Sequence, residues 1–422
     1  MKYLLLTIGT RGDAEPFLAI GDLLQKAGHE VIIALPEQLC PLAEDTGLRF
    51  EALDRRFLEL LEGETARNFM GQKGSAFSRA IQLLRLSRQS MSVQDNMILE
   101  QRNLLLRHTP DRVVYHPKCL VARAWGIANE GQSIGISPIP NWLHPVREYP
   151  HIAVSRNLGT RGNLLSYRFI NWMTAFMSAR YVKPFRQDFP GTSLNRRAIT
   201  HYMQQQERML YLISPSLFPR PDYWPEQAKV LGYFERPKTN SWQPASELIQ
   251  FVDRFRAENI TFITFGSMIN ARPEVTTDNI IKVLSRLGIP AIINTSSGGL
   301  LKREGVADHI HFVSNIPYEW IFPKVHSVVH HGGSGTTHTA TKHGCPSLVI
   351  PHIVDQFFWN ERVADLGLGP KGVKIKHLSE ERFERLLLEL RSNEDYRIRA
   401  VSFQEKMIAE GKTDLLLEEL SR

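Results

Sequence analysis

The hydrophobic positions in the first 150 residues fall into short apolar runs, separated by longer stretches of helical composition. The runs are rich in Leu, Ile and Val and are bounded by glycine, proline or polar residues, which is typical of buried strands. The predicted strands are 2–8, 29–35, 112–115 and 132–136, and the predicted helices are 16–26, 91–108 and 119–129. Strands that alternate with helices predict βαβ units and a parallel sheet covered on both faces.

The second half of the chain repeats this plan. Its predicted strands are 260–265, 291–294, 310–313, 325–331 and 347–350, and its predicted helices are 274–287 and 334–342. Each half has a glycine-containing turn after its first strand, at Gly9 and at Gly266. Because parallel sheets bind ligands beyond the carboxyl ends of their strands, we expect two facing α/β domains with a ligand cleft between them.

Changes in composition predict the domain boundaries. The proline-rich stretch from Pro215 to Pro244 shows little periodicity, as expected of a linker. The residues after Ser379 have helical composition and are rich in Glu, Leu and Arg. We therefore predict an N-terminal domain at 1–215, a linker at 216–243, a C-terminal domain at 244–378 and terminal helices at 379–422.

Two segments do not fit a minimal sheet. Residues 55–90 are rich in Arg, Gly and Ser, and residues 138–190 contain many aromatic residues. Within the second segment, Phe169, Trp172 and Phe176 share one face of a predicted helix with two methionines. Two interpretations are open for this face: packing in the core, or a lid that lines an apolar pocket or touches a membrane.

The composition is ordinary for a soluble globular chain, with 42% hydrophobic and 23% charged residues among 422. No apolar run reaches the length of about 18 residues that a membrane span needs, and the apolar N-terminus is too short for a signal peptide. Three widely spaced cysteines predict neither a disulfide framework nor a metal site. We expect a cytoplasmic protein.

The net charge of +7 favours anionic partners such as nucleotides, phosphates or acidic lipids. The chain has no long Lys/Arg run and no zinc-finger or RNA-binding signature, so we expect no nucleic-acid partner. Basic residues at Arg55-Arg56 and between 67 and 88 leave a peripheral contact with an anionic membrane open. The alternative for these residues is a solvated basic lid.

Histidines, glycines and hydroxyl residues are concentrated between His330 and Thr337, where a predicted strand meets a predicted helix. Glycines let a ligand approach the backbone, and the start of a helix offers free N–H groups and the positive end of the helix dipole. His331 can donate to a phosphate oxygen, and Ser334 and Thr336 add hydroxyl donors. The pattern predicts a diphosphate site without a P-loop lysine.

Two other turns that follow strands carry candidate chemistry. Asp355 and Gln356 can accept from and donate to neighbouring sugar hydroxyls. Asp13 stands in a turn whose spacing, Gly9-x-x-Gly12, lacks the third glycine of a dinucleotide-binding fingerprint. Asp13 is either an ordinary helix N-cap or a general base that takes a proton from an acceptor hydroxyl.

These motifs resemble the inverting nucleotide-sugar glycosyltransferases of the GT-B fold, in particular sterol glucosyltransferases and the glycosyltransferases of antibiotic biosynthesis. The resemblance rests on the turn at 9–16, the stretch 329–337, and Pro351 with Asp355-Gln356, in this order along the chain. It implies two Rossmann-like domains and a last helix that returns to the N-terminal domain. It also implies a nucleotide-sugar donor, a UDP-sugar or a TDP-sugar, of which UDP-glucose is the commonest in the family.

The resemblance implies roles for individual residues. Asp13 matches the carboxylate proposed as the general base, and His331 matches the residue that meets the α-phosphate of the donor. Asp355 and Gln356 match the pair that holds the hexose. The other residues that match donor-binding positions are Gly12, Ser267, Trp320, Gly333, Ser334, Gly335 and Thr336.

Plant members of the wider family differ from this chain. They use a histidine base near the N-terminal turn and a ribose-binding glutamate where this chain has Thr339, so the resemblance is to the bacterial and sterol branch. His116 ends a predicted strand near the position of the aspartate that supports the plant base. It either takes part in catalysis or shapes the turn before Pro117.

We expect an apolar acceptor such as a sterol, a terpenoid, a polyketide or a lipid. The candidate acceptor contacts are His116, Trp142, Phe169, Trp172 and Phe176. A single displacement, with Asp13 as base and the groups around His331 stabilising the leaving diphosphate, requires no cofactor and no metal. A nucleotide-sugar epimerase of the same fold and a non-catalytic nucleotide-sugar-binding protein are alternatives, and an NAD-linked oxidoreductase is the weakest interpretation.

Overall fold

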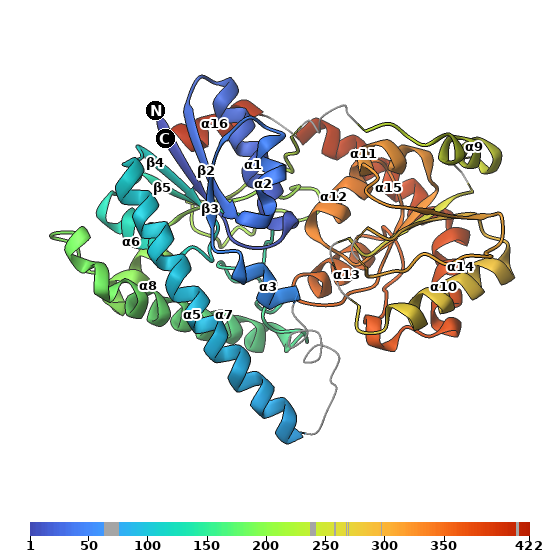
Figure 1. Ribbon diagram of the computed structural model, residues 1–422, viewed down its shortest axis with the longest axis horizontal. Helices are drawn as coiled ribbons and strands as arrows, with labels where there is room; N and C mark the ends of the chain where they lie inside the picture. The colour runs from blue at the N-terminus through green and yellow to red at the C-terminus, as the bar shows by residue number, and fades with distance from the viewer. Residues whose placement is uncertain are drawn as a thin grey trace. The chain divides into compact units, whose positions relative to one another are not determined.

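The computed structural model describes residues 1–62, 76–236, 242–256, 259–266, 268, 270–296, 298–410 and 413–422, and the side chains of these residues apart from 61–62 and 76–91. The chain forms two compact units, of which unit 1 is Met1–Lys238 with Gly411–Arg422 and unit 2 is Thr239–Glu410. Each unit is a parallel sheet packed between helices (Figure 1), so the α/β class predicted from the sequence is confirmed.

Unit 1 contains a seven-stranded sheet in the order β3-β2-β1-β4-β5-β6-β7, in which every neighbouring pair is parallel. Its strands are β1 (Lys2–Leu6), β2 (Glu30–Pro36), β3 (Arg49–Leu53), β4 (Arg112–Tyr115), β5 (Ser133–Ser137), β6 (Arg208–Tyr211) and β7 (Ala228–Val230). The strand order reverses at β1, which has β2 on one side and β4 on the other. Leu6 pairs with Tyr115 at the ends of β1 and β4. The residues that follow these two strands therefore emerge side by side, at the position where open α/β sheets bind ligands.

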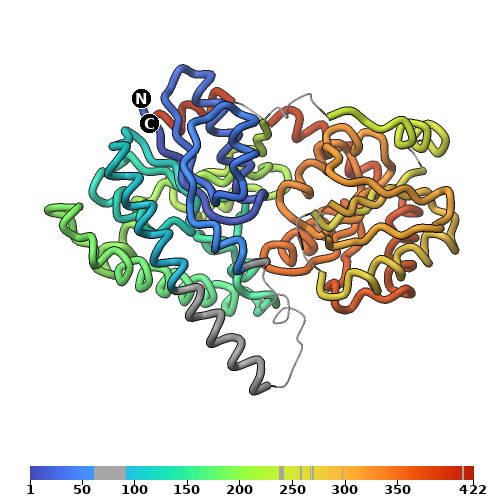
Figure 2. The backbone as a smooth tube through the Cα atoms, in the orientation of Figure 1, coloured from blue at the N-terminus to red at the C-terminus, as the bar shows by residue number. Residues whose placement is uncertain are grey.

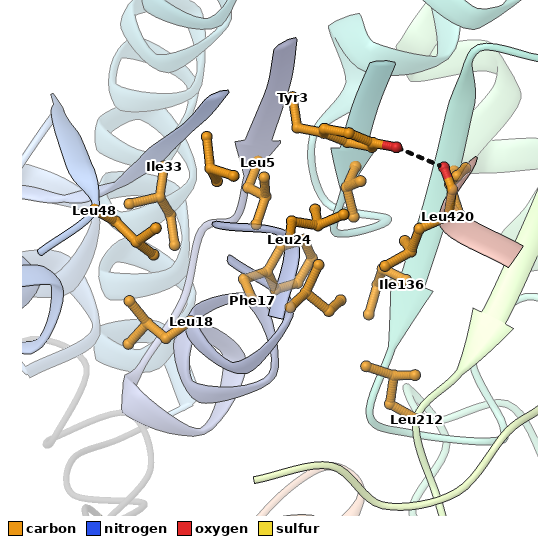
Figure 3. Close-up of a cluster of buried hydrophobic side chains, with 14 of the residues drawn as sticks. Tyr3, Leu5, Phe17, Leu18, Leu24, Ile33, Leu48, Ile136, Leu212 and Leu420 are labelled. Atoms are coloured by element: carbon orange, nitrogen blue, oxygen red, sulfur yellow. Dashed lines mark hydrogen bonds between the residues drawn. The ribbon is translucent and has the colours of Figure 1, made fainter. Parts of the chain in front are cut away.

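The helices of unit 1 cover both faces of this sheet. They are α1 (Arg11–Lys26), η1 (Glu37–Leu39), α2 (Cys40–Glu44), α3 (Arg56–Glu62), α5 (Ala76–His108), α6 (Leu120–Ala128), α7 (Gly159–Val182), η2 (Lys183–Asp188), α8 (Arg196–Gln205) and α16 (Thr413–Ser421). One face packs against α1 and α16 in a core that contains Phe17, Leu24, Ile33 and Leu420 (Figure 3).

The two ends of the chain meet within unit 1 (Figure 2). The hydroxyl of Tyr3 donates to the carbonyl of Leu420 at 3.3 Å (Figure 3). Glu419 is buried and accepts from Lys229 Nζ at 2.6 Å. The last helix is thus part of the core of unit 1, although the helix before it in the chain belongs to unit 2.

The segment predicted as a linker, 216–243, has more structure than its composition indicates. Residues 216–236 belong to unit 1, and β7 adds the last strand to its sheet by pairing with β6. Arg220 fixes this segment by donating to the carbonyls of Trp224 at 2.6 Å and Ala228 at 2.7 Å. A three-residue edge strand between prolines is too short to leave a periodic signal, which is why the sequence did not predict it.

Unit 2 contains a five-stranded parallel sheet in the order β10-β9-β8-β11-β12. Its strands are β8 (Thr261–Thr264), β9 (Ala291–Asn294), β10 (Ile310–Val313), β11 (Ser327–His330) and β12 (Ser347–Val349). The strand order reverses at β8, and Thr264 pairs with His330 at the ends of β8 and β11. This edge is the equivalent of the β1/β4 edge in unit 1.

The helices of unit 2 form two cores, one on each face of its sheet. They are α9 (Ser246–Phe255), α10 (Pro273–Leu287), α11 (Tyr318–Ile321), η3 (Phe322–Lys324), α12 (Ser334–Lys342), α13 (Gln356–Asp365), η4 (Ile375–His377), α14 (Glu380–Ser392) and α15 (Glu394–Glu410). One core joins α10 and α14, and the other joins α9, α11 and α12. Within the described ranges of both units, no helix is both long enough and apolar enough to cross a membrane.

Candidate active site

The first candidate site lies where β1 and β4 end in unit 1. Asp13 Oδ2 accepts the backbone N–H of Thr10 at 3.0 Å, which caps α1. Gly9 has φ of 143°, and a Cβ at this position would lie 2.0 Å from Asp13 Oδ2. Glycine at position 9 therefore gives the carboxylate the space to fold back onto the turn. The cap starts the helix at Arg11, ahead of the predicted start at Pro16.

Two basic side chains from the turn after β4 face the same carboxylate. Lys118 Nζ donates to Asp13 Oδ1 at 3.0 Å. His116 Nε2 lies 3.3 Å from Oδ1, although its geometry is not that of a hydrogen bond. His116 Nδ1 accepts the backbone N–H of Lys118 at 3.2 Å. The proton of the neutral imidazole is therefore on Nε2, which faces Asp13.

Burial and the interactions among Asp13, Lys118 and His116 determine which of these groups are charged. Burial raises the pKa of Asp13, but Lys118 and His116 outweigh it, so the net effect lowers the pKa. Burial, reinforced by the charge of Lys118, lowers the pKa of His116 to about 3. At neutral pH the site thus contains an ionised carboxylate, an ammonium group and a neutral imidazole. Such a carboxylate can take a proton from a hydroxyl group.

A buried ion pair holds the turn that carries His116 and Lys118. Arg123 donates from Nη1 to the carbonyl of Pro117 at 3.0 Å and from Nε to Glu207 at 2.9 Å. Arg123 and Glu207 are each 1% exposed. Because Glu207 stands directly before β6, two distant parts of the chain fix the positions of His116 and Lys118 at Asp13. Sequence reasoning missed Lys118, Arg123 and Glu207.

The second candidate site lies where β8 and β11 end in unit 2. His331 follows β11 and is 7% exposed. Its ring lies between two glycines: a Cβ on Gly266 would be 2.6 Å from Cε1, and a Cβ on Gly333 would be 2.5 Å from Nε2. Gly266 also has φ of 56°. Side chains at these two positions would displace the imidazole, which explains why glycines surround it.

The first turn of α12 follows this histidine directly. Gly333 is the N-cap, and its carbonyl accepts from Thr337 Oγ1 at 2.9 Å. Ser334 and Thr336 are largely buried, whereas Gly335 is exposed. The start of a helix carries free N–H groups and a partial positive charge, which suit an anion such as a phosphate.

His331 faces this turn as a neutral side chain. Burial, followed by the neighbouring His330 and His352, holds its pKa well below the ordinary value. Its Nδ1 is buried and has no hydrogen-bond partner within the described parts of unit 2. Neutral imidazole carries one N–H, so His331 can give one hydrogen bond to an anion while the helix supplies the positive potential.

Asp355 and Gln356 stand in the turn after β12, where α13 begins. Gln356 Oε1 accepts the backbone N–H groups of His352 at 2.7 Å and Ile353 at 3.0 Å, so its oxygen shapes the turn. Its Nε2 lies 3.0 Å from the sulfur of Met268, a weak acceptor. That amide group is the part of Gln356 that a sugar hydroxyl can engage.

The residue before this pair has a strained backbone. Val354 has φ of 48° and is 42% exposed. The left-handed region costs a β-branched residue about 1–3 kcal/mol, and such strain concentrates at ligand sites. The turn that presents the partly exposed Asp355 holds Val354 in this conformation.

Thr264 organises the ends of the central strands of unit 2. Its hydroxyl lies 2.9 Å from the hydroxyl of Tyr318, and it accepts from the backbone of Gly266 at 3.1 Å and from Asn294 Nδ2 at 3.3 Å. Thr264 therefore links the glycine beside His331 to α11. Its position as the last residue of β8 is a sequence signal that could have identified it.

Comparison with known proteins agrees with this architecture. Residues 3–98 match the glycosyltransferase family 28 N-terminal domain, and residues 279–421 match the erythromycin biosynthesis protein CIII-like C-terminal domain. Among solved structures, the glycosyltransferase of kitacinnamycin is similar with a TM-score of 0.71 at 18% identity, covering 99% of each chain. The chain thus combines these two glycosyltransferase-type domains in the GT-B fold.

Relatives of this chain include enzymes with named acceptors. The sterol 3-beta-glucosyltransferase UGT80B1 of Arabidopsis thaliana is 29% identical over 394 residues, covering 90% of this chain and 61% of the relative. A sterol 3-beta-glucosyltransferase of Saccharomyces cerevisiae is 26% identical, covering 97% of this chain and 34% of the relative. The chain thus spans less than two thirds of the length of these sterol enzymes. The spinosyn rhamnosyltransferase SpnG, solved with thymidine diphosphate, has a TM-score of 0.66 at 19% identity and covers all of both chains.

The remaining predicted donor residues have varied surroundings. Trp320, in α11, packs against Trp242 at 5.2 Å between ring centroids and lies under Lys324 Nζ at 4.6 Å. Gly12 is exposed in the first turn of α1, and a Cβ there would meet only Thr10 Oγ1 at 3.9 Å. Ser267 lies outside the described residues. The donor roles of all three stay predictions.

The aromatic residues predicted to contact the acceptor do not gather in one place. The ring of Trp142 lies 5.3 Å from that of His116 and 5.6 Å from Lys118 Nζ, so it borders the Asp13 cluster. Phe169, Trp172 and Phe176 lie exposed on α7, with exposed fractions of 61%, 44% and 44%. Packing of these three rings in the core, one of the two predicted interpretations, is therefore wrong. The structure joins Trp142 to the candidate site and shows no such contact for the other three.

Proposed function

We propose that this glycosyltransferase moves a hexose from a UDP-sugar, UDP-glucose above all, to a hydroxyl group of an apolar acceptor. A sterol, a terpenoid, a polyketide or a lipid fits this acceptor class. One observation carries the proposal: each unit holds, at the reversal point of its strand order, the chemical groups for one half of the transfer. Unit 1 has the carboxylate of Asp13, and unit 2 has His331 at the N-terminus of α12.

The reaction we propose is one displacement. Asp13 takes the proton of the acceptor hydroxyl as the acceptor oxygen bonds to the anomeric carbon. The bond from that carbon to the β-phosphate oxygen breaks, and its electron pair leaves with the diphosphate. Attack from the face opposite the leaving group inverts the anomeric configuration.

The residues of unit 2 account for the leaving group in this proposal. The His331 N–H and the free N–H groups at the start of α12 stabilise the charge that develops on the diphosphate. Asp355 and the amide group of Gln356 bind the hexose hydroxyls. The N–H groups of His331 and of the start of α12 take the role that a metal ion has in other transferases, so the proposal includes no metal and no cofactor.

In this proposal, unit 1 supplies the general base, Asp13, and the residues that control its ionisation. Lys118 and His116 keep Asp13 ionised before the acceptor binds. The same contacts make Asp13 a weaker base, so a bound acceptor has to compete with Lys118 for Oδ1.

Trp142, beside His116, supplies an apolar wall for the acceptor. Support for a sterol-like acceptor comes from the sterol glucosyltransferases among the relatives.

The test begins with calorimetric binding of the full chain to UDP-glucose, UDP-galactose, TDP-glucose, GDP-mannose and NAD. The preferred donor is then incubated with a panel of sterols, terpenoids and long-chain alcohols, and the anomeric configuration of any product is read by NMR. We expect a UDP-sugar preference and a β-linked product from an α-linked donor.

Other outcomes would favour the alternatives. Conversion of the donor sugar to its epimer without an acceptor would indicate an epimerase. Tight donor binding with no transfer to any acceptor would indicate a binding protein. Preference for NAD would contradict the assignment of unit 2.

A further inference from the structure

Helix α7 exposes large apolar side chains, although its buried side is partly polar. The buried residues are Asn163, Ser166, Tyr167, Ala175, Ser178 and Val182. The exposed apolar residues, which we name the α7 ridge, are Leu165, Phe169, Trp172 and Phe176, with exposed fractions of 59%, 61%, 44% and 44%. Their spacing places all four on one side of the helix. A helix that packs only against its own domain exposes polar side chains on its outer side, so the folding of unit 1 does not explain the ridge.

Hydrogen bonds fix the inner face of α7 in this orientation. Asn163 Nδ2 donates to the carbonyl of Arg147 at 3.1 Å, and Ser166 Oγ accepts the backbone N–H of His151 at 2.9 Å. Further along the helix, Asn171 Nδ2 donates to the carbonyl of Leu143 at 2.9 Å. Turning the ridge inward would break these bonds and leave buried polar groups unpaired. The outward position of the aromatic rings is therefore built into the domain.

The rings of the ridge contact one another. Phe169 and Trp172 stack with centroids 6.4 Å apart, and Trp172 and Phe176 stack with centroids 5.9 Å apart and planes 14° apart. The guanidinium of Arg196, from α8, lies 5.9 Å from the Trp172 ring. The result is a continuous apolar surface with a cation at its side. Contiguous apolar surface of this kind marks a binding face.

The ridge lies in a basic part of the chain. Residues 151–206 contain eight Lys and Arg residues, all exposed: Arg156, Arg161, Arg168, Arg180, Lys183, Arg186, Arg196 and Arg197. The only acidic residue of the segment, Asp188, is bonded to Arg102 at 2.6 Å. This segment therefore carries a net charge of +7, as large as that of the whole chain. Arg161 precedes the first ridge residue by one helical turn, and Arg180 follows the last by one turn.

We propose that the α7 ridge docks on an anionic lipid bilayer. The aromatic rings would enter the interfacial layer, and the surrounding arginines would bind the phosphates of the head groups. A bilayer offers an apolar layer beneath a continuous negative surface, which matches both properties of this face. In a dimer formed through this face, two segments 151–206, each with a net charge of +7, would lie against each other. Charge repulsion therefore opposes self-association through this face.

Of the two locations for which membrane contact was predicted, the structure favours the aromatic face of α7. Arg55 pairs with Glu59 at 2.7 Å, and Arg56 pairs with Asp54, so neighbouring acids compensate these two charges. Residues 67–88 lie where side chains are not described. The α7 ridge and its basic rim are a different surface, and the proposal does not depend on the transferase activity.

Co-sedimentation of the full chain with lipid vesicles tests the proposal. Vesicles of phosphatidylcholine with phosphatidylglycerol are compared with vesicles of phosphatidylcholine alone, at low and high salt. We expect binding to the anionic vesicles that weakens with salt. The triple substitution Phe169→Ser, Trp172→Ser, Phe176→Ser should lower the partition coefficient by about tenfold or more, because it removes the apolar contact. The substitution Arg161→Glu with Arg180→Glu should have a similar effect on anionic vesicles only.

Matched controls separate this surface from general effects. Ile398→Ser with Ile408→Ser removes two equally exposed apolar side chains of unit 2, at 64% and 67% exposure, and should leave binding unchanged. Thermal unfolding shows whether each variant is folded. Absence of wild-type binding to anionic vesicles, or full binding by the folded triple variant, would overturn the proposal. Binding of a single-stranded oligonucleotide through the same residues, without vesicle binding, would overturn it in favour of a nucleic-acid site.

Discussion

Lys118 Nζ donates a 3.0 Å hydrogen bond to Oδ1 of Asp13, although the two residues are 105 positions apart. They meet because β1 and β4 are neighbours at the point where the strand order of unit 1 reverses. The pair keeps the carboxylate ionised and occupies one of the oxygens that an acceptor hydroxyl would use. Lys118 is thus a positioning residue that sets the basicity of Asp13.

The first prediction concerns the pH profile of transfer. In Lys118→Met the cation is lost, so the pKa of Asp13 rises. Because the proposed mechanism needs Asp13 in its ionised form, activity is lost as the pH falls through this pKa, and the acidic limb of kcat/KM should move to higher pH. The profile is measured between about pH 3 and 8, in the pH range over which the folded protein is stable, with Lys118→Arg as the charge-conserving control. An acidic limb that stays in place would show that Lys118 does not tune the base.

The second prediction concerns Asp13 itself. Asp13→Asn keeps an oxygen for the N–H of Thr10 but cannot take a proton. Transfer should fall about 10²- to 10⁴-fold, the usual contribution of general base catalysis, while the Kd for the UDP-sugar stays within about twofold. Asp22→Asn, on the same helix and paired with Lys26 at the surface, is the control. Transfer at the wild-type rate by Asp13→Asn would rule out Asp13 as the base.

The third prediction concerns the donor site. His331→Ala removes one hydrogen bond to a charged ligand, worth about 1.5–3 kcal/mol, which corresponds to roughly a tenfold to hundredfold loss of UDP-sugar affinity. Calorimetry measures the Kd, and His377→Ala, at an exposed position of unit 2, is the control. Unchanged donor affinity in folded His331→Ala would place the diphosphate elsewhere.

The fourth prediction concerns stability. Glu207→Gln leaves the buried guanidinium of Arg123 without its counter-ion, which should cost about 3–5 kcal/mol in the unfolding of unit 1. Urea unfolding followed by a unit 1 signal measures the loss. Glu30→Gln, which removes the exposed partner of Lys2, should cost less than about 1 kcal/mol. If Glu207→Gln lowers the free energy of unfolding as little as Glu30→Gln does, the buried pair does not hold the turn of His116 and Lys118.

The fifth prediction concerns metal ions. We propose that His331 and the start of α12 stabilise the negative charge of the diphosphate. Transfer should therefore continue at its full rate after treatment with EDTA. The assay compares treated enzyme with enzyme supplied with Mg²⁺ or Mn²⁺. Loss of activity that either ion restores would contradict the metal-free mechanism.

Much of the fold could be predicted because strands and glycine turns are local features. Apolar runs of four to seven residues predicted strands close to β1, β2 and β9. The start of α1 was misplaced because the side-chain cap at Thr10 and Asp13 outweighs the signal of Pro16. The strand β7 was missed because three residues at a sheet edge have no period to detect.

The sequence by itself determined the chemistry of the contiguous motifs. His331, the glycines around it and Asp13 stand in short turns whose residue types already indicate an anion site and a base, since each turn is made by neighbouring residues. Only the tertiary structure brought Lys118 to Asp13 and Glu207 to Arg123, because parallel strands join residues that are far apart in the chain. Only the tertiary structure decided that the aromatic side of α7 faces outward. Periodicity shows that a helix has two faces, but the hydrogen bonds of its neighbours select which face is buried.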